Sequence, residues 1–320
     1  MAKKLNILIL ADRPEWQSQE LRAAIAKQGG QSLCLSLSDL AFSSGLANSD
    51  HLPAATHTSP GLYFPAEFYE HFLSLEALDG VLVRGVAAGS FEQITLRLSI
   101  LHALHHLGVR VINTPRAIEC CVDKAMTSFL LHQARVPTPH FWAGENRDAL
   151  QAYRRSPNSS ADLVIKPLFG AMGKNLRRIG TDAELPDAAQ YNGVWYAQEF
   201  IRNGVSSPDS KGCFHDYRVL VAGGEVLAAM RREHHNWITN VAQGGQCHPL
   251  GDADDLAELS RLALAASQAV GAEFCGVDVI CDRNGKYWVL EVNSMAAWHG
   301  LQSVIKHNLA GKIIEILFHR

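Results

Sequence analysis

The sequence predicts an α/β unit with a mainly parallel sheet, followed by a larger α+β region. First, fully apolar runs alternate with helical periodicity before residue 114, which is typical of parallel strands buried on both faces. Second, tight-turn hairpins appear after residue 194, which is typical of antiparallel pairing. Third, a length of 320 residues suggests two or three structural units, and a hydrophobic content of 47% is enough for substantial cores.

Composition narrows the class of protein further. The net charge of −3 gives no indication of a nucleic-acid or membrane-surface partner. The seven cysteines include no CxxC pair, so we expect reduced thiols, not a disulfide framework or a zinc site. No run approaches the about 20 apolar residues of a membrane span, and the apolar run near the N-terminus is short for a signal peptide. We therefore expect a cytoplasmic protein.

The N-terminal unit, residues 1 to about 114, consists of short apolar strands and helices with one apolar face. The expected elements are strands at Leu5–Leu10, Ser32–Leu37, Gly80–Val86 and Val109–Asn113, and helices at Ser18–Lys27 and Phe91–Leu107. No GxGxxG fingerprint follows the first strand, so no dinucleotide site is predicted. Residues 51–65 are expected to form an exposed loop. Arg84 lies inside a buried strand, where it either pairs within the fold, the preferred interpretation, or faces a ligand.

A helix is expected from Thr114-Pro115 to about Ala134, with threonine as its N-cap and proline at its first position. Lys124 lies near the middle of this helix. A helical lysine is usually solvated, so Lys124 alone indicates no function.

The next expected strand, Asp162–Pro167, carries Lys166 near its end. The loop that follows contains Gly170 and Gly173, and such a loop can bring backbone N–H groups against phosphate oxygens. It lacks the GK[ST] step of the Walker pattern. An ordinary hairpin loop is the alternative interpretation.

A strand at Val194–Ile201 carries Gln198 and Glu199 near its end, and the loop 203–212 follows. A hairpin of His215–Ala222 and Glu225–Arg231 turns at Gly223-Gly224. Asp216 and Arg218 share a face because they are two residues apart, and they could pair with each other. The other expected elements are the loop Trp237–Gly245, which must bring backbone segments close together, and helices at Asp254–Val270 and Ser303–Phe318.

The hairpin Phe274–Asn293 is the most informative stretch. Its turn, Asp282-Arg283-Asn284-Gly285, contains residues that tolerate positive φ. Glu291 and Asn293 point to the same face of the second strand, and Asp278 can face them from the first. Two carboxylates and one amide oxygen are hard ligands that suit Mg²⁺. A surface hairpin with a polar wet face is the alternative.

The order of these motifs resembles the ATP-grasp superfamily, and most closely the RimK-type α-L-glutamate ligases. The resemblance covers residues 123–293 closely and rests on the segments DKAMTSFLL, VPTP, VIKPLFG, AQEFI, HDYRVLVAGG, TNVAQGG, CGVDVI and LEVN. Residues 1–114 are similar to a preATP-grasp domain in general pattern only. SFEQITLRLSILHAL and the residues after EVN are also similar to the tetrahydromethanopterin-linked ligases of methylotroph one-carbon metabolism.

The resemblance implies a preATP-grasp domain at 1–114 and an ATP-grasp domain at 115–320, divided into subdomains 115–196 and 197–320. It also implies ATP and one or two Mg²⁺ ions, with Mn²⁺ as a substitute. The implied ATP-binding residues are Lys124, Lys166, Gly170, Gly173, Glu199, Phe200, Asp216, Thr239 and Asn240. The implied metal ligands are Asp278, Glu291 and Asn293, and Arg218 and Arg231 are the implied catalytic residues that would hold a carboxylate or acyl phosphate.

The implied reaction joins a carboxylate to an amine through an acyl phosphate and releases ADP. The expected substrates are L-glutamate and a small acceptor such as a pterin or furan cofactor precursor, and a homo-oligomer is compatible with this class. Two alternatives are a ligase that modifies a protein C-terminus and a nucleotide-binding protein without catalysis.

The sequence departs from the family pattern at two places. Ile238 directly precedes Thr239, and the family's arginine near this step is absent, so the nearby base would have to be Arg231 or Arg232. The loop Ser294–Gly300 lacks the family's usual proline turn, and it is where we expect the acceptor to be recognised.

Overall fold

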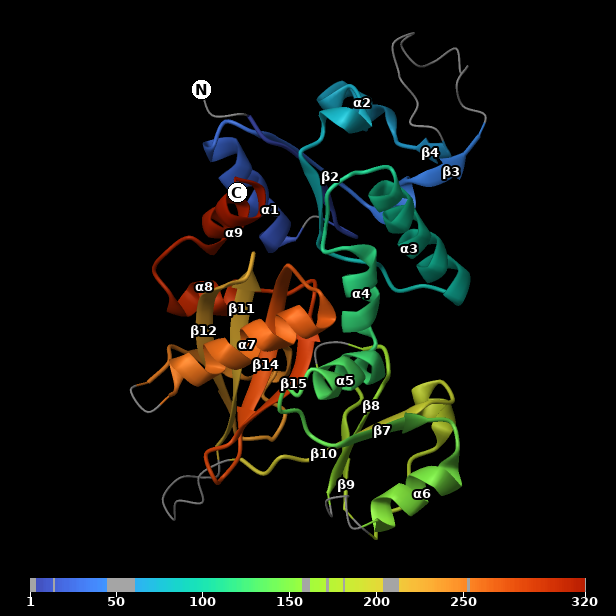
Figure 1. The fold of residues 1–320 in the computed structure, drawn as a ribbon, viewed down its shortest axis with the longest axis vertical. Coiled ribbons are helices and arrows are strands. Elements are labelled where there is room, and N and C mark those ends of the chain that lie inside the picture. The colour runs from blue at the N-terminus through green and yellow to red at the C-terminus, as the bar shows by residue number, and fades with distance from the viewer. Residues whose placement is uncertain are drawn as a thin grey trace. The chain divides into compact units, whose positions relative to one another are not determined.

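The computed structural model describes residues 4–13, 15–44, 61–156, 162–170, 173–180, 182–203, 213–251 and 254–319 (Figure 1). Residues 51–60, Ala171-Met172 and most of the expected loop 203–212 lie outside them. The chain forms two compact units. Unit 1 contains Met1–Ile118, Met295–His299 and His307–Arg320, and unit 2 contains Glu119–Ser294 and Gly300–Lys306.

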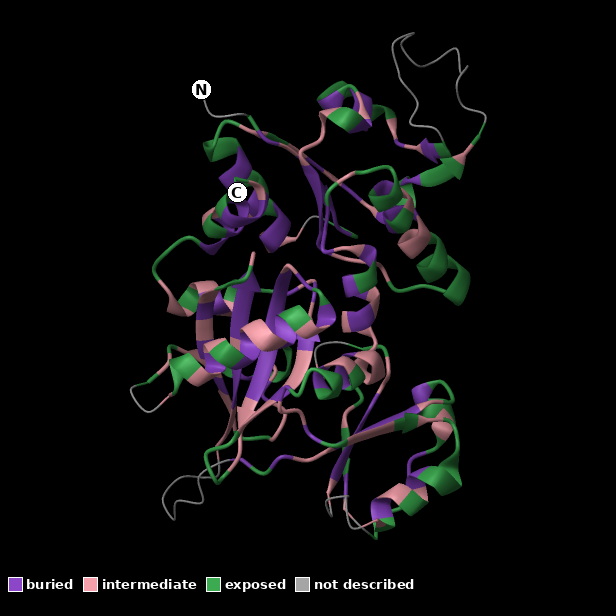
Figure 2. Cartoon of the chain, in the orientation of Figure 1, coloured by how far each residue is buried: buried purple, intermediate pink, exposed green. Residues whose placement is uncertain are grey.

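Unit 1 is built on a parallel sheet in the order β2-β1-β5-β6. Its strands are β1 (Asn6–Leu10), β2 (Gln31–Leu35), β5 (Gly80–Val83) and β6 (Val111–Ile112). β1 and β5 are buried along most of their length (Figure 2), as expected for strands covered on both faces. The other elements are α1 (Trp16–Lys27), α2 (Ala66–Phe72), α3 (Phe91–His106), α9 (Leu309–Phe318) and the small antiparallel pair β3 (Ala41–Ser43) and β4 (Gly61–Tyr63). The predicted mainly parallel sheet is confirmed.

The C-terminal helix α9 belongs to unit 1. A Cβ on Gly80 would lie 2.7 Å from the Phe318 ring, and Arg110 donates a hydrogen bond to the Leu317 carbonyl at 2.9 Å. The predicted continuous helix Ser303–Phe318 is wrong, because α8 (His299–Val304) ends before α9 begins. Asn308 caps α9 by accepting a hydrogen bond from the Gly311 N–H, which restarts the helix. The predicted division after residue 114 assigned these C-terminal residues to the second domain, whereas the structure places them in unit 1.

Arg84 directly follows β5 and pairs within unit 1, as the preferred interpretation predicted. Its guanidinium lies 3.4 Å from a Glu15 carboxylate oxygen and 4.8 Å from the Trp298 ring centre. Burial lowers the pKa of Arg84 to about 10, and the Glu15 carboxylate opposes this shift. The structural interpretation of Arg84 is therefore confirmed.

The expected helix Thr114–Ala134 is two helices, α4 (Pro115–Val122) and α5 (Lys124–Gln133). Thr114 accepts a hydrogen bond from the Ala117 N–H, as predicted for an N-cap. The helix is interrupted at Asp123, whose carboxylate accepts hydrogen bonds from the Ala125 and Met126 N–H groups. Lys124 therefore begins α5 and does not lie in mid-helix, since an aspartate N-cap starts a new helix there.

The small sheet of unit 2 has the antiparallel order β7-β10-β8-β9. Its strands are β7 (Phe141–Gly144), β8 (Leu163–Lys166), β9 (Arg177–Ile179) and β10 (Trp195–Glu199). One face packs Ile165 and Ala197 against Leu150 of α6 (Arg147–Arg155). Because side chains alternate along a strand, Lys166 and Gln198 point to the opposite face.

The large sheet of unit 2 is antiparallel with the order β13-β12-β11-β14-β15. Its strands are β11 (Phe214–Ala222), β12 (Glu225–His234), β13 (Gln246–His248), β14 (Phe274–Cys281) and β15 (Tyr287–Asn293). Helix α7 (Leu256–Val270) covers one face through Leu259, Leu262 and Ala266 (Figure 1). The other face carries the polar residues of the site. No helix in the described ranges is long and apolar enough to cross a membrane.

Candidate active site

A pocket in unit 2 lies between residues of the small sheet and residues of the large sheet, and it gathers most of the predicted site residues. Those that line it are Lys124, Lys166, Gly170, Gly173, Glu199, Phe200, Asp216, Thr239, Asn240, Asp278 and Glu291. Arg218, Arg231 and Asn293 do not line it. The lining also includes Gln198, Trp237 and Leu290, which are not among the predicted site residues.

The two lysines converge from different elements. Lys124 Nζ donates a hydrogen bond to the Gly170 carbonyl at 2.8 Å, and Lys166 Nζ donates to Gln198 Oε1 at 2.6 Å. Burial lowers the pKa of both lysines, that of Lys166 to about 8. Glu291 faces their charges. Burial raises its pKa, but the lysines outweigh this effect and hold the pKa at about 2. The pocket therefore combines buried cations with an ionised carboxylate.

Two glycines allow close backbone approach at the pocket. Gly173 has φ +69°, and a Cβ there would lie 2.7 Å from the Asn240 side-chain oxygen. A Cβ on Gly245 would lie 1.9 Å from the Thr239 carbonyl oxygen, so only glycine fits. The predicted close approach within the loop Trp237–Gly245 is confirmed. The N–H groups of Ala171 and Met172 lie outside the described residues.

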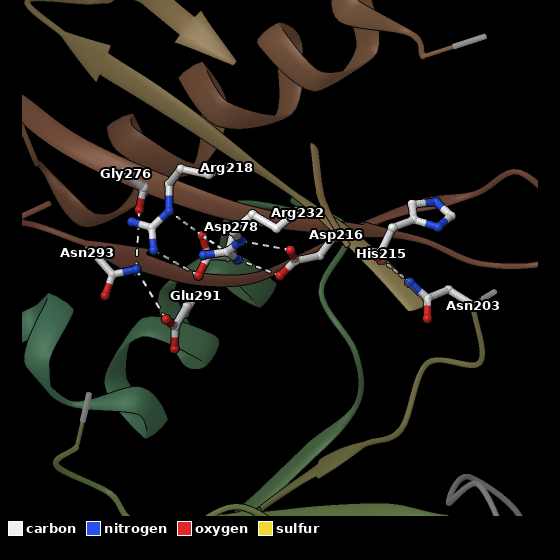
Figure 3. Close-up of polar contacts among 9 residues, drawn as sticks. All are labelled: Asn203, His215, Asp216, Arg218, Arg232, Gly276, Asp278, Glu291 and Asn293. Atoms are coloured by element: carbon white, nitrogen blue, oxygen red, sulfur yellow. Dashed lines mark hydrogen bonds and ion pairs between the residues drawn. The ribbon is translucent and has the colours of Figure 1, made fainter. Parts of the chain in front are cut away.

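Four charged residues form a ladder across the pocket face of the large sheet (Figure 3). Arg232 binds both oxygens of Asp216, with its Nε at 2.8 Å from Oδ1. Its guanidinium also lies 3.2 Å from Asp278 Oδ1. Arg218 Nε lies 2.7 Å from the same Asp278 oxygen. Asp216 and Arg218 therefore pair with residues on neighbouring strands, and the alternative pairing between these two is not what the structure shows.

Arg231 is not brought to this face. It lies opposite Tyr217 in the sheet register, on the side that α7 covers, and its guanidinium is 2.6 Å from Glu233. Arg232 lies opposite Asp216 instead and is 3% exposed. The strand register therefore brings Arg232, and not Arg231, to the face that carries Asp216.

The metal-ligand candidates are arranged as the hairpin predicted. Asp278 lies directly opposite Glu291, and Asn293 lies opposite Gly276. Asn293 Nδ2 donates a hydrogen bond to Glu291 at 3.2 Å. Burial raises the pKa of Asp278 to about 6, and the Arg218 and Arg232 charges oppose this shift.

This donor set fits Mg²⁺. The carboxylates of Asp278 and Glu291 and the amide oxygen of Asn293 come from neighbouring strands and share one face, and Mg²⁺ prefers such oxygen ligands. In the described part of the chain, no group of three His, Cys, Asp or Glu side chains could hold a metal. A set of two carboxylates and one amide does not need such a group.

An aromatic cluster lies at the end of β10. The Arg178 guanidinium stacks over the Phe200 ring at 3.9 Å, and the Trp237 ring meets Phe200 edge-on at 5.8 Å between ring centres. Glu199 and Phe200 were predicted beside an adenine. Trp237 and Arg178 carry no sequence signal for this location, because they come from loops and strands distant in the chain.

An antiparallel small sheet that carries Lys166 faces an antiparallel large sheet that carries Asp278 and Glu291, and Lys124 of α5 joins them at the pocket. This arrangement defines an ATP-grasp protein. The RimK-like ATP-grasp domain matches residues 121–317, and the chain belongs to this family. This confirms the resemblance and the predicted fold class.

The chain is similar to known proteins over most of its length. It is 30% identical to the tetrahydromethanopterin:alpha-L-glutamate ligase of Methanosarcina acetivorans over 295 residues, which is 87% of this chain and 82% of that protein. It is 32% identical to the enzyme of the same name from Methanococcus maripaludis, over 78% of this chain and 82% of that protein.

Solved structures share the fold at low sequence identity. The ATP-grasp ligase PsnB, complexed with its minimal precursor, has a TM-score of 0.67 and 16% identity and covers 98% of this chain and 99% of its own. A RimK domain protein from Sphaerobacter thermophilus has a TM-score of 0.61 and 19% identity, over 98% of this chain and 99% of its own.

Proposed function

We propose that this protein is an ATP- and Mg²⁺-dependent ligase that joins L-glutamate to a small tetrahydromethanopterin-type acceptor and releases ADP. The observation that carries the proposal is the pocket itself. Lys124 and Lys166 approach it from one side, while Asp278 and Glu291 approach it from the other. Polyanions with a divalent cation match this division of charge.

The two lysines would neutralise the nucleotide phosphates, and Gly170 and Gly173 would allow the loop to pass close to them. Thr239 and Asn240 would border the same phosphates. Glu199 and Phe200 would lie beside the adenine, where backbone groups supply most of the recognition. Asp216 would act through Arg232, which it binds with both oxygens, and Arg232 would keep Asp278 in place.

Asp278, Glu291 and Asn293 would hold one or two Mg²⁺ ions, for which Mn²⁺ would substitute. The bound metal would offset the negative charge of the phosphates during transfer. Arg218 ends beside Asp278, and its planar guanidinium suits a carboxylate or acyl phosphate. Positioning and charge neutralisation would carry the rate, without a covalent nucleophile from the protein.

The proposed reaction has two steps and needs only ATP, the carboxylate and the amine. A substrate carboxylate oxygen attacks the γ-phosphorus and the bond to ADP breaks. The amine then attacks the acyl carbon, phosphate leaves with the bonding electrons, and the amine releases a proton. An acyl phosphate must be protected from water during this interval.

The acceptor is inferred from similarity. The chain matches tetrahydromethanopterin:alpha-L-glutamate ligases over most of its length, and we expect the loop Ser294–Gly300 to select the acceptor. The expected subdomains 115–196 and 197–320 divide β10 (Trp195–Glu199), which pairs within the small sheet, so we propose the boundary after β10 and assign α9 to unit 1. A cytoplasmic location is also part of this proposal. We also keep a homo-oligomer as compatible with it.

The test is a reaction with purified protein, ATP, MgCl₂, L-glutamate and a tetrahydromethanopterin-type acceptor. We expect stoichiometric ADP and an acceptor heavier by one or more glutamyl residues in mass spectrometry. Formation of AMP would show adenylation and would overturn the acyl-phosphate route. ADP formed only with a peptide acceptor would overturn the assignment of the acceptor class.

A further inference from the structure

Gln198 is a buried side chain in β10 that joins two parts of the pocket. It is 1% exposed. Its Oε1 accepts a hydrogen bond from Lys166 Nζ at 2.6 Å, and its Nε2 donates to the Leu290 carbonyl at 3.5 Å. Leu290 immediately precedes Glu291 in β15. One amide therefore connects a lysine of the small sheet to the strand that carries a metal-ligand candidate.

The sheet register brings Gln198 and Lys166 together. Tyr196 lies opposite Lys166, and Gln198 lies opposite Val164, so Gln198 and Lys166 are diagonal neighbours on one face. Lys166 is 9% exposed, and its ammonium cannot rely on solvent. A buried ammonium is costly without an acceptor, and the amide oxygen of Gln198 is that acceptor.

The chemistry of the acceptor matters because Lys166 is one of the cations that face a phosphate ligand. An amide oxygen accepts a hydrogen bond from one of the three ammonium N–H groups. Because the amide is neutral, the lysine keeps its full positive charge. A carboxylate in the same place would form an ion pair and cancel that charge. It would also lose the donor that reaches Leu290. A glutamine supplies both a neutral acceptor and a donor, which neither glutamate nor methionine does.

We propose that Gln198 is a positioning residue for nucleotide binding, which holds the Lys166 ammonium in the pocket through a neutral acceptor. The inference rests on the proposed function, in which Lys166 faces the phosphates of ATP. Gln198 contacts Lys166 and not the aromatic cluster around Phe200. A change at Gln198 should therefore alter the affinity for the phosphates of ATP and leave the affinity for its adenine unchanged.

The test compares Gln198→Glu with Gln190→Glu, an exposed glutamine of the same unit that does not line the pocket. Calorimetry measures binding of ATP with MgCl₂, and ligand-observed NMR measures adenosine, which has no phosphate. We expect Gln198→Glu to weaken ATP binding about tenfold or more, because it cancels one buried cation. Its adenosine affinity should stay near that of the wild type, and Gln190→Glu should change neither ligand.

A second variant separates charge from hydrogen bonding. Gln198→Met removes the acceptor without adding charge, so we expect it to weaken ATP binding less than Gln198→Glu does. The thermal midpoints of both variants serve as the fold control, because Gln198→Glu gains an ion pair with Lys166 but loses the hydrogen bond to the Leu290 carbonyl.

Wild-type ATP affinity in Gln198→Glu would overturn the inference. Equal loss of ATP and adenosine would also overturn it, because Gln198 would then support only the fold. If the wild-type protein itself binds no ATP, the proposed function fails, and this inference fails with it.

Discussion

The hairpins β11–β12 and β14–β15 both supply the pocket face of the large sheet, and each contains one extra residue. Leu227 has no directly opposite residue in the first hairpin, and Leu290 has none in the second. Such β-bulges shift the pairing by one position beyond the bulge. Because side chains alternate with a period of two, a shift of one residue exchanges the two faces of the sheet.

The consequence differs between the hairpins. Counted from Gly223-Gly224 without a bulge, Arg231 would lie opposite Asp216, but the structure places Arg232 there. Counted from its turn without a bulge, β15 would place Leu290 opposite Asp278, but the structure places Glu291 there. In the first hairpin Arg231 and Arg232 are adjacent, so only the strand register shows which of them faces Asp216. In the second hairpin the LEVN motif contains a single carboxylate, Glu291, so its residue types already identify the ligand candidate.

Removing Arg232 should have the largest effect on stability. In Arg232→Leu, Asp216 and Asp278 stay buried but lose a shared cation, and we expect a loss of about 3–5 kcal/mol in the free energy of unfolding. Urea denaturation followed by circular dichroism measures it. A loss under about 1 kcal/mol would show that the ladder does not depend on Arg232.

Glu291→Ala should leave the fold intact and remove most turnover, by at least about 100-fold, because the site loses its ionised carboxylate. The rate of ADP formation at saturating ATP and Mg²⁺ measures this effect, and the circular dichroism spectrum serves as the fold control. Activity near that of the wild type would make the metal assignment wrong.

Asn293→Ala should cost less than Glu291→Ala, about tenfold in turnover, because an amide carries no charge and Asn293 also orients Glu291 through its hydrogen bond. The comparison uses the same ADP assay at several Mg²⁺ concentrations. We expect excess Mg²⁺ to recover part of the lost rate. A larger loss than in Glu291→Ala would reverse the order of the two ligands.

Arg231→Leu should have the smallest effect and is the matched control for Arg232→Leu. Its side chain is 32% exposed and faces Glu233, so we expect a change within about 1 kcal/mol in the free energy of unfolding and nearly normal turnover. A loss of activity comparable to that expected for Glu291→Ala would restore Arg231 as a residue of the reaction.

Much of the fold could be predicted from local pattern. The parallel strands of unit 1 follow from apolar runs, and the turn at Asp282–Gly285 follows from its residue types, with Gly285 at φ +80°. The helix break at Asp123 was missed, although an aspartate before KAMTS is also an N-cap signal. The interruption between α8 and α9 was missed because Asn308, which caps α9, lies inside the range predicted as one continuous helix.

The candidate site was predicted in part. The lysines and carboxylates follow from the order of motifs, and the pocket gathers them. Trp237 and Gln198 were not assigned to the site, because their importance depends on neighbours across strands and loops. No spacing within a strand shows that Gln198 reaches both Lys166 and Leu290.

The sequence by itself determined the family, the order of the elements and the residue types that face a phosphate and a cation. The tertiary structure decided which of two adjacent arginines enters the ladder and how Asp278 comes to lie opposite Glu291. The physical reason is that motif chemistry is local, whereas strand register depends on the β-bulges at Leu227 and Leu290, each of which exchanges the two faces of the strand beyond it.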